Sequence, residues 1–149
     1  MTTIFFKFLH LAAAIVWIGG MAFMLWFLRP VATTQLQAAQ RAPLMAGVMG
    51  RFFPAVWLCI ALLMGTGTLM LLTLGMKSAP LGWHLMLGIG LLMFAVFGHL
   101  YFGPFKHLKR AITVTDWPEA GRRLGQIQGL VKLNFVLSWL AIAAVFFLH

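Results

Sequence analysis

Acidic residues are almost absent from this sequence. Its 149 residues include only Asp116 and Glu119 as acids, against 11 lysines and arginines, so the formal net charge is +9. Both acids lie within one short polar segment, and none lies in an apolar run. The chain therefore has no intramembrane carboxylate to relay protons and no set of carboxylate oxygens to hold a hard cation such as Ca²⁺.

Cysteine is nearly absent as well. Cys59 is the single cysteine and lies inside an apolar run, which excludes a disulfide framework and a CxxC metal site and indicates a packing role. Walker, glycine-rich dinucleotide and Ser/His/Asp patterns are also missing. The first apolar run continues to Leu28 and meets Arg29 and Pro30, where a signal peptide would have a small-residue cleavage site. We therefore expect this run to remain as a membrane span.

Apolar residues dominate what is present. Hydrophobic residues make up 62% of the chain and charged residues 9%, a composition outside that of soluble domains. Four apolar runs, 4–28, 52–75, 81–105 and 131–148, are long enough to cross about 30 Å of hydrocarbon. Backbone polar groups in lipid must be satisfied within the segment, so each run is expected to be a helix. The sequence predicts an all-α, integral membrane four-helix bundle, one domain over residues 1–149, whose first partner is the lipid bilayer.

Basic residues predict how the chain is oriented. Nine of them lie in or beside the long connections 29–51 and 106–130, whereas only Lys7 and Lys77 lie on the opposite side. The positive-inside rule makes both connections cytoplasmic and both termini periplasmic, in the inner membrane of a bacterium. Because these bases sit only between apolar runs, the charge does not indicate nucleic-acid binding. Within 106–130, Asp116 is placed to cap a helix that feeds into the fourth span.

Two histidines are the leading candidates for a metal site. His10 lies about 9 Å inside the first run, and His84 lies three residues into the third run, which crosses in the same direction. We expect the two imidazoles at matched depth near the outer leaflet, as a bis-His pair for the iron of haem b. His99, about 22 Å deeper than His84, is expected to be a secondary metal or hydrogen-bonding site. The alternative is that these are hydrogen-bonded structural histidines.

Residues around this pair fit a cofactor. Trp17, Gly88 and Gly67 are expected at a similar level. The glycines there leave room for a flat macrocycle, although small residues also allow helices to pack closely without a cofactor. Lys7 and Lys77 are placed to pair with haem propionates, or simply to reach the interface.

Methionine supplies a different hypothesis. The chain has 10 methionines, and thioethers are soft ligands that suit copper(I). They form no array of repeated MxxxM or MxM motifs, and membrane helices also use methionine for packing.

The first helix carries a family resemblance. Residues 9–20 read LHLAAAIVWIGG, an LHxxAAxxWxGG pattern. This segment resembles the first helix of the copper-resistance D (CopD) group of membrane proteins, and the similarity extends loosely through the other three helices. The resemblance implies a role in copper uptake or resistance in the bacterial inner membrane.

A second resemblance concerns the third helix. HemJ-type protoporphyrinogen oxidases are similar in length, with a histidine in helix 1 and a Trp-x-His-x-Lys-like motif opening helix 3. Residues 82–87 read GWHLML, which keeps the aromatic residue and the histidine but has no lysine after them. This resemblance implies haem b between His10 and His84.

Three functional hypotheses follow. The main one is a haem b electron-transfer protein that exchanges electrons with a quinol or another redox protein. The alternatives are a copper-handling membrane protein and a HemJ-like oxidase, so whether the chain is an enzyme is left open. A homo-oligomer is also left open.

Overall fold

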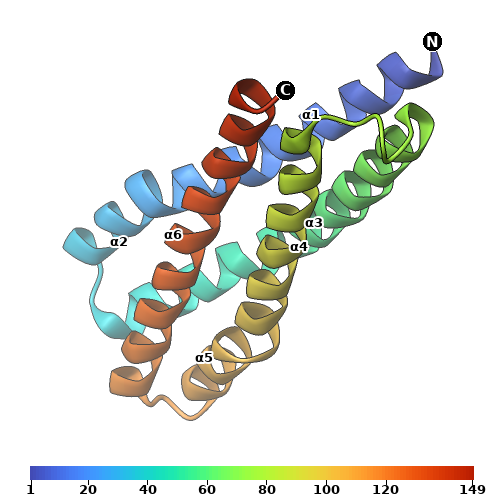
Figure 1. Ribbon diagram of the computed structural model, residues 1–149. Helices are drawn as coiled ribbons and strands as arrows, with labels where there is room; N and C mark the ends of the chain where they lie inside the picture. Colours follow the sequence, from blue (N-terminus) through green and yellow to red (C-terminus); the bar gives the residue numbers. More distant parts are fainter.

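The computed structural model describes residues 1–149 as a bundle of helices without strands (Figure 1). The elements are the helices α1 (Thr2–Phe23), α2 (Arg29–Gln35), α3 (Ala38–Leu74), α4 (Leu81–Phe102), α5 (Pro104–Thr113) and α6 (Trp117–Phe147), with the π-helical segment η1 (Met24–Leu28) between α1 and α2. Four helical stretches are long and apolar enough to cross a membrane. The predicted all-α membrane bundle is therefore confirmed.

The helices extend well beyond the apolar runs. The first stretch is helical from Thr2 to Gln35, and α3 already begins at Ala38, so most of the expected connection 29–51 is helical. The expected connection 106–130 is likewise taken up by α5 and the start of α6. Hydropathy marks the part of a helix that lipid covers, whereas the helix itself continues through good helix formers such as Ala38, Ala39 and Gln40.

Prolines shape the backbone where α2 and α5 begin. Pro30 has no N–H, so the carbonyl of Trp26 loses its usual partner four residues on. The preceding turn is π-helical, and the N–H of Arg29 bonds the carbonyl of Met24, five residues earlier. At Gly103 the chain breaks between α4 and α5, and Pro104 occupies the first turn of α5, where its missing donor costs nothing.

The predicted cap at Asp116 is confirmed. The Asp116 carboxylate accepts a hydrogen bond of 3.2 Å from the N–H of Glu119 and opens α6. The Glu119 carboxylate does not return to the cap; it pairs with Arg122 at 2.9 Å and with Arg123 at 2.7 Å. Both acids of the chain are thus engaged within the first turns of α6.

The bundle packs mainly as two helix pairs, α1 with α3 and α4 with α6. Its interior holds an aromatic cluster around Phe53, whose ring packs edge-on against Phe97 and Phe105. Many large apolar side chains point outward instead, among them Ile15, Leu58 and Trp139. A soluble monomer rarely exposes so much apolar surface, so this exterior is one that lipid would cover.

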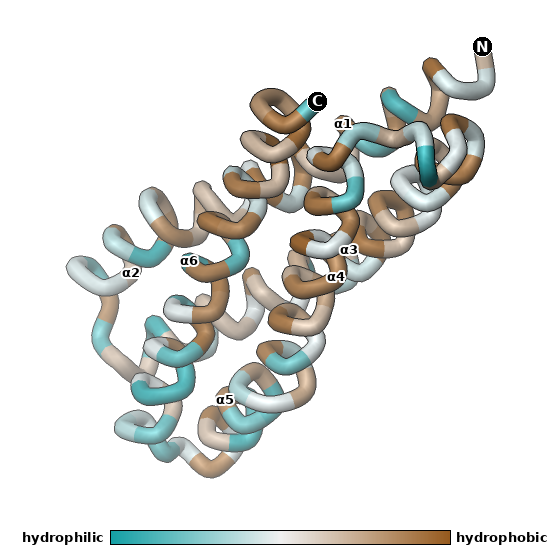
Figure 2. The backbone as a smooth tube through the Cα atoms, in the orientation of Figure 1, coloured by the Kyte–Doolittle hydropathy of each residue, from teal (hydrophilic) through white to brown (hydrophobic).

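The two ends of the bundle differ. Both termini and the turn between α3 and α4 lie at one end, which we call the terminal end (Figure 1). The α2–α3 and α5–α6 connections lie at the other, which we call the basic end because most lysines and arginines are there. Figure 2 shows the hydrophilic residues gathered around α2, α5 and the start of α6, with a largely hydrophobic middle.

Close approach of α4 and α6 at the terminal end requires glycine at position 82. A Cβ there would collide with the carbonyl oxygen of Ala144 and lie 2.7 Å from that of Leu148. The N–H of Gly82 also donates to the Leu148 carbonyl at 2.7 Å.

We therefore expect Gly82→Ala to destabilise the bundle by about 1–3 kcal/mol through overpacking, lowering the melting temperature in detergent by several degrees. Gly88→Ala is the matched control, because a Cβ at Gly88 would meet nothing within 4 Å. Equal melting temperatures of the two variants would contradict the close approach of α4 to α6.

Candidate functional site

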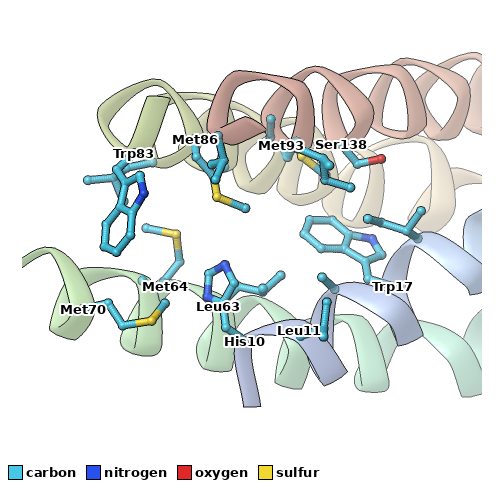
Figure 3. A pocket seen from close by; sticks show the side chains of 18 of the residues that line it. His10, Leu11, Trp17, Leu63, Met64, Met70, Trp83, Met86, Met93 and Ser138 are labelled. Atoms are coloured by element: carbon cyan, nitrogen blue, oxygen red, sulfur yellow. The ribbon is translucent and has the colours of Figure 1, made fainter. Parts of the chain in front are cut away.

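A cavity of about 370 Å³ lies between the four membrane helices, in the half of the bundle nearer the terminal end. Of its 23 lining residues, 18 are hydrophobic, and the others are Lys7, His10, Gly67, Gly90 and Ser138. The cavity therefore offers one imidazole in an almost entirely apolar wall. Figure 3 shows this space from close by.

His10 is held by a defined hydrogen bond. Its Nδ1 lies 2.8 Å from the hydroxyl oxygen of Thr66 on α3, and that hydroxyl lies 2.6 Å from the carbonyl oxygen of Leu62. A hydroxyl has one proton, and a carbonyl can only accept it, so Thr66 donates to Leu62 and accepts from His10. Nδ1 of His10 therefore carries the ring proton, and Nε2 keeps a free lone pair. This is the arrangement in which a histidine serves as a metal ligand.

Gly67 lets the ring of His10 lie against α3. A Cβ at Gly67 would be 3.3 Å from Cε1 of His10, tighter than an ordinary van der Waals contact. The expectation that Gly67 lies at the level of His10 is confirmed, and its role is to admit the imidazole close to the helix backbone.

Four methionines line the same cavity. Met64 and Met70 come from α3, and Met86 and Met93 come from α4. In Figure 3 the side chains of Met64 and Met86 project into the space beside His10, with Trp83 and Trp17 at its two sides. The fold thus gathers thioethers that form no repeat in the sequence.

The other candidate residues divide between the cavity and its surroundings. Lys7 and Trp17 line it together with His10 and Gly67, whereas His84, Gly88, Lys77 and His99 do not. Nε2 of His84 lies 2.9 Å from the carbonyl oxygen of Met76, in the turn before α4. The structure therefore does not bring His84 into the cavity with His10.

Helix geometry explains this placement. Each residue turns the side chain by about 100°, so Trp83, Met86, Leu87 and Gly90 form one stripe on α4 that faces the cavity. His84 is adjacent to Trp83 in sequence but is rotated out of that stripe. His99, further along α4, is exposed, and no group of three or more His, Cys, Asp or Glu side chains lies close together.

Sequence reasoning did not identify which methionines share one cavity, or that Trp83 and Ser138 line it. A readable signal was present: Met64, Gly67 and Met70 recur every three residues on α3, and Met86, Gly90 and Met93 recur at spacings of four and three on α4. Such spacing places side chains on one helix face. It does not say that the two faces meet across a cavity.

This set of side chains is suited to a soft metal ion. One neutral imidazole and several thioethers, with no carboxylate nearby, are poor ligands for Mg²⁺ or Ca²⁺ and good ligands for Cu(I). Fold and cavity together define the class: a multi-pass helical membrane protein with a soft-donor cavity inside the bundle.

Comparison with known families agrees with this class. The family model described as Copper resistance protein D (CopD) matches residues 46–148, most of α3 and all of α4, α5 and α6. The chain belongs to the CopD family. No curated protein and no solved structure gives a match.

The hydrogen bond to Thr66 generates a test of the His10 tautomer. In protein labelled with ¹⁵N-histidine, NMR should show His10 protonated at Nδ1 and unprotonated at Nε2. Thr66→Val keeps the shape but removes the acceptor, so the Nδ1–H preference should be lost. Thr68→Val, on the exposed face of α3, should leave the spectrum unchanged; an unaltered tautomer in Thr66→Val would contradict the assigned hydrogen bond.

Proposed function

We propose that this CopD-family protein handles copper by binding Cu(I) in the cavity between its membrane helices. The observation that carries the proposal is the free Nε2 of His10 in a cavity that also holds four thioethers. Nε2 of His10 would be the nitrogen ligand, and Met64 and Met86, whose side chains point into the same space in Figure 3, would supply sulfur ligands.

The chemistry of the cavity favours copper as a transient cargo. Thioethers bind Cu(I) without losing a proton, and the tautomer set by Thr66 makes His10 ready to bind without deprotonation. The largely apolar wall offers the ion few competing oxygen ligands. Lys7, on the lining and exposed, marks the side of the cavity nearer the terminal end.

Haem b remains a second hypothesis, favoured by the apolar lining and the available imidazole of His10. The bis-His form of this hypothesis needs the ring of His84, which is bonded to the Met76 carbonyl and outside the cavity. A haem would therefore have to be held by His10 together with either a rotated His84 or a methionine of the cavity. A HemJ-like oxidase activity depends on the same haem and is tested with it.

We expect the detergent-purified protein to bind Cu(I) and His10→Ala to weaken the affinity at least about tenfold, or about 1.4 kcal/mol. The double variant Met64→Leu/Met86→Leu keeps the packing volume and should also lose affinity, because only the thioether ligands are removed. Competition against a chromophoric Cu(I) chelator measures the Cu(I) affinity of the unaltered chain and of both variants.

His99→Ala and Met76→Leu are the matched controls, since both residues are exposed and lie outside the cavity. They should bind Cu(I) like the unaltered chain. If His10→Ala binds equally well, the copper site is elsewhere. A red protein whose haem spectrum is lost in both His10→Ala and His84→Ala would replace the copper proposal with the bis-His haem.

For the location, we propose the bacterial inner membrane with both termini periplasmic. The support is the charge asymmetry, with nine basic residues toward the basic end against Lys7 and Lys77 toward the terminal end. In this orientation the His10 cavity lies in the periplasmic half of the bundle.

A reporter that works only in the cytoplasm should therefore be silent when fused after His149, and active when fused into the α5–α6 connection at Thr115. The reverse pattern would overturn the orientation, because both fusions report on the same bundle from opposite ends.

A further inference from the structure

A second, smaller pocket of about 130 Å³ lies toward the basic end, away from the His10 cavity. Its polar side chains are Arg29 and Thr33 from α2, Arg41 from α3 and Gln128 from α6. Its apolar wall includes Met24, Met45 and Met49. Three helices that are separate in sequence thus contribute polar groups to one small space.

The positive charge in this pocket has no counter-charge from the protein. Nη1 of Arg29 is shielded from solvent and has no hydrogen-bond partner. Arg41 makes only one long hydrogen bond, 3.5 Å from its Nη1 to the carbonyl oxygen of Thr33. The two acids of the chain are used elsewhere, Asp116 in capping α6 and Glu119 in pairing with Arg122 and Arg123.

Two guanidinium groups facing one pocket repel each other, and a buried guanidinium nitrogen without an acceptor is costly. An anion with several oxygens would remove both costs at once. Phosphate oxygens match the planar, forked donors of arginine, and the Thr33 hydroxyl and the Gln128 amide add neutral donors.

From this arrangement we propose that the Arg29/Arg41 pocket binds a phosphate group, supplied either by an anionic lipid headgroup or by free inorganic phosphate. Binding links α2, α3 and α6 at the basic end, where the α2–α3 connection is only Leu36 and Gln37. The site is independent of copper, since none of its lining residues belongs to the His10 cavity.

The test compares the unaltered chain with Arg29→Gln/Arg41→Gln in phosphatidylcholine nanodiscs, with and without phosphatidylglycerol. Native mass spectrometry should show phosphatidylglycerol retained by the unaltered chain and reduced at least about tenfold in the double variant. Arg51→Gln is the matched control, because Arg51 lies on α3 near the same end but is exposed and outside the pocket.

A second arm uses inorganic phosphate in a neutral detergent, with chloride at equal ionic strength as reference. A rise in melting temperature with phosphate in the unaltered chain and in Arg51→Gln, absent in the double variant, identifies free phosphate as a ligand of the pocket. Phosphatidylglycerol retention without this rise identifies the lipid headgroup as the source.

The proposal is overturned if the double variant retains phosphatidylglycerol and responds to phosphate like the unaltered chain, or if neither probe binds the unaltered chain. Arg29→Met gives a further reading that does not depend on the double variant folding. In neutral detergent without phosphate or lipid it should melt at least as high as the unaltered chain, because an uncompensated charge is removed. Its melting temperature should then not rise when phosphatidylglycerol is added. A rise equal to that of the unaltered chain would also overturn the proposal.

Discussion

The lack of water in the hydrocarbon core is the constraint on which this structure depends. A polar atom placed there is costly unless it finds a partner within the protein. The buried hydroxyl groups of Thr66 and Ser138 meet this condition by donating to carbonyl oxygens of their own helix, those of Leu62 and Phe135. Only Thr66 is then positioned to accept a second bond, and it accepts from His10. One local hydrogen bond therefore sets the tautomer of the imidazole in the cavity.

The same constraint separates the two ends of the molecule. Near the terminal end the bundle encloses soft, uncharged donors, with Met64 and Met86 beside His10. At the basic end the acids satisfy the start of α6 and leave Arg29 and Arg41 unneutralised. The proposed copper site and the proposed phosphate pocket can coexist because they lie in different parts of the bundle and share no residue.

Some features follow from local patterns and were predictable. The four spans follow from apolar runs, and the cap at Asp116 follows from an acid placed before Trp117 and Pro118. The helix ends could not be predicted from the apolar runs. The first run ends at Leu28, whereas α1, η1 and α2 continue to Gln35. Hydropathy reports the solvent around a helix, whereas its end depends on backbone hydrogen bonds and capping.

By itself the sequence determined the class of the protein, a four-helix membrane bundle, and singled out His10 as a candidate functional residue, because a histidine in an apolar span requires a partner. Only the tertiary structure decided what surrounds His10. The expected partner His84 is directed to the Met76 carbonyl, while Met64 and Met86 from different helices share its cavity. Depth along a helix can be counted from the sequence, but which face meets which depends on the rotation of each helix about its axis. That rotation is set by packing among all four helices, including the close contact of Gly82 with α6 and of Gly67 with His10.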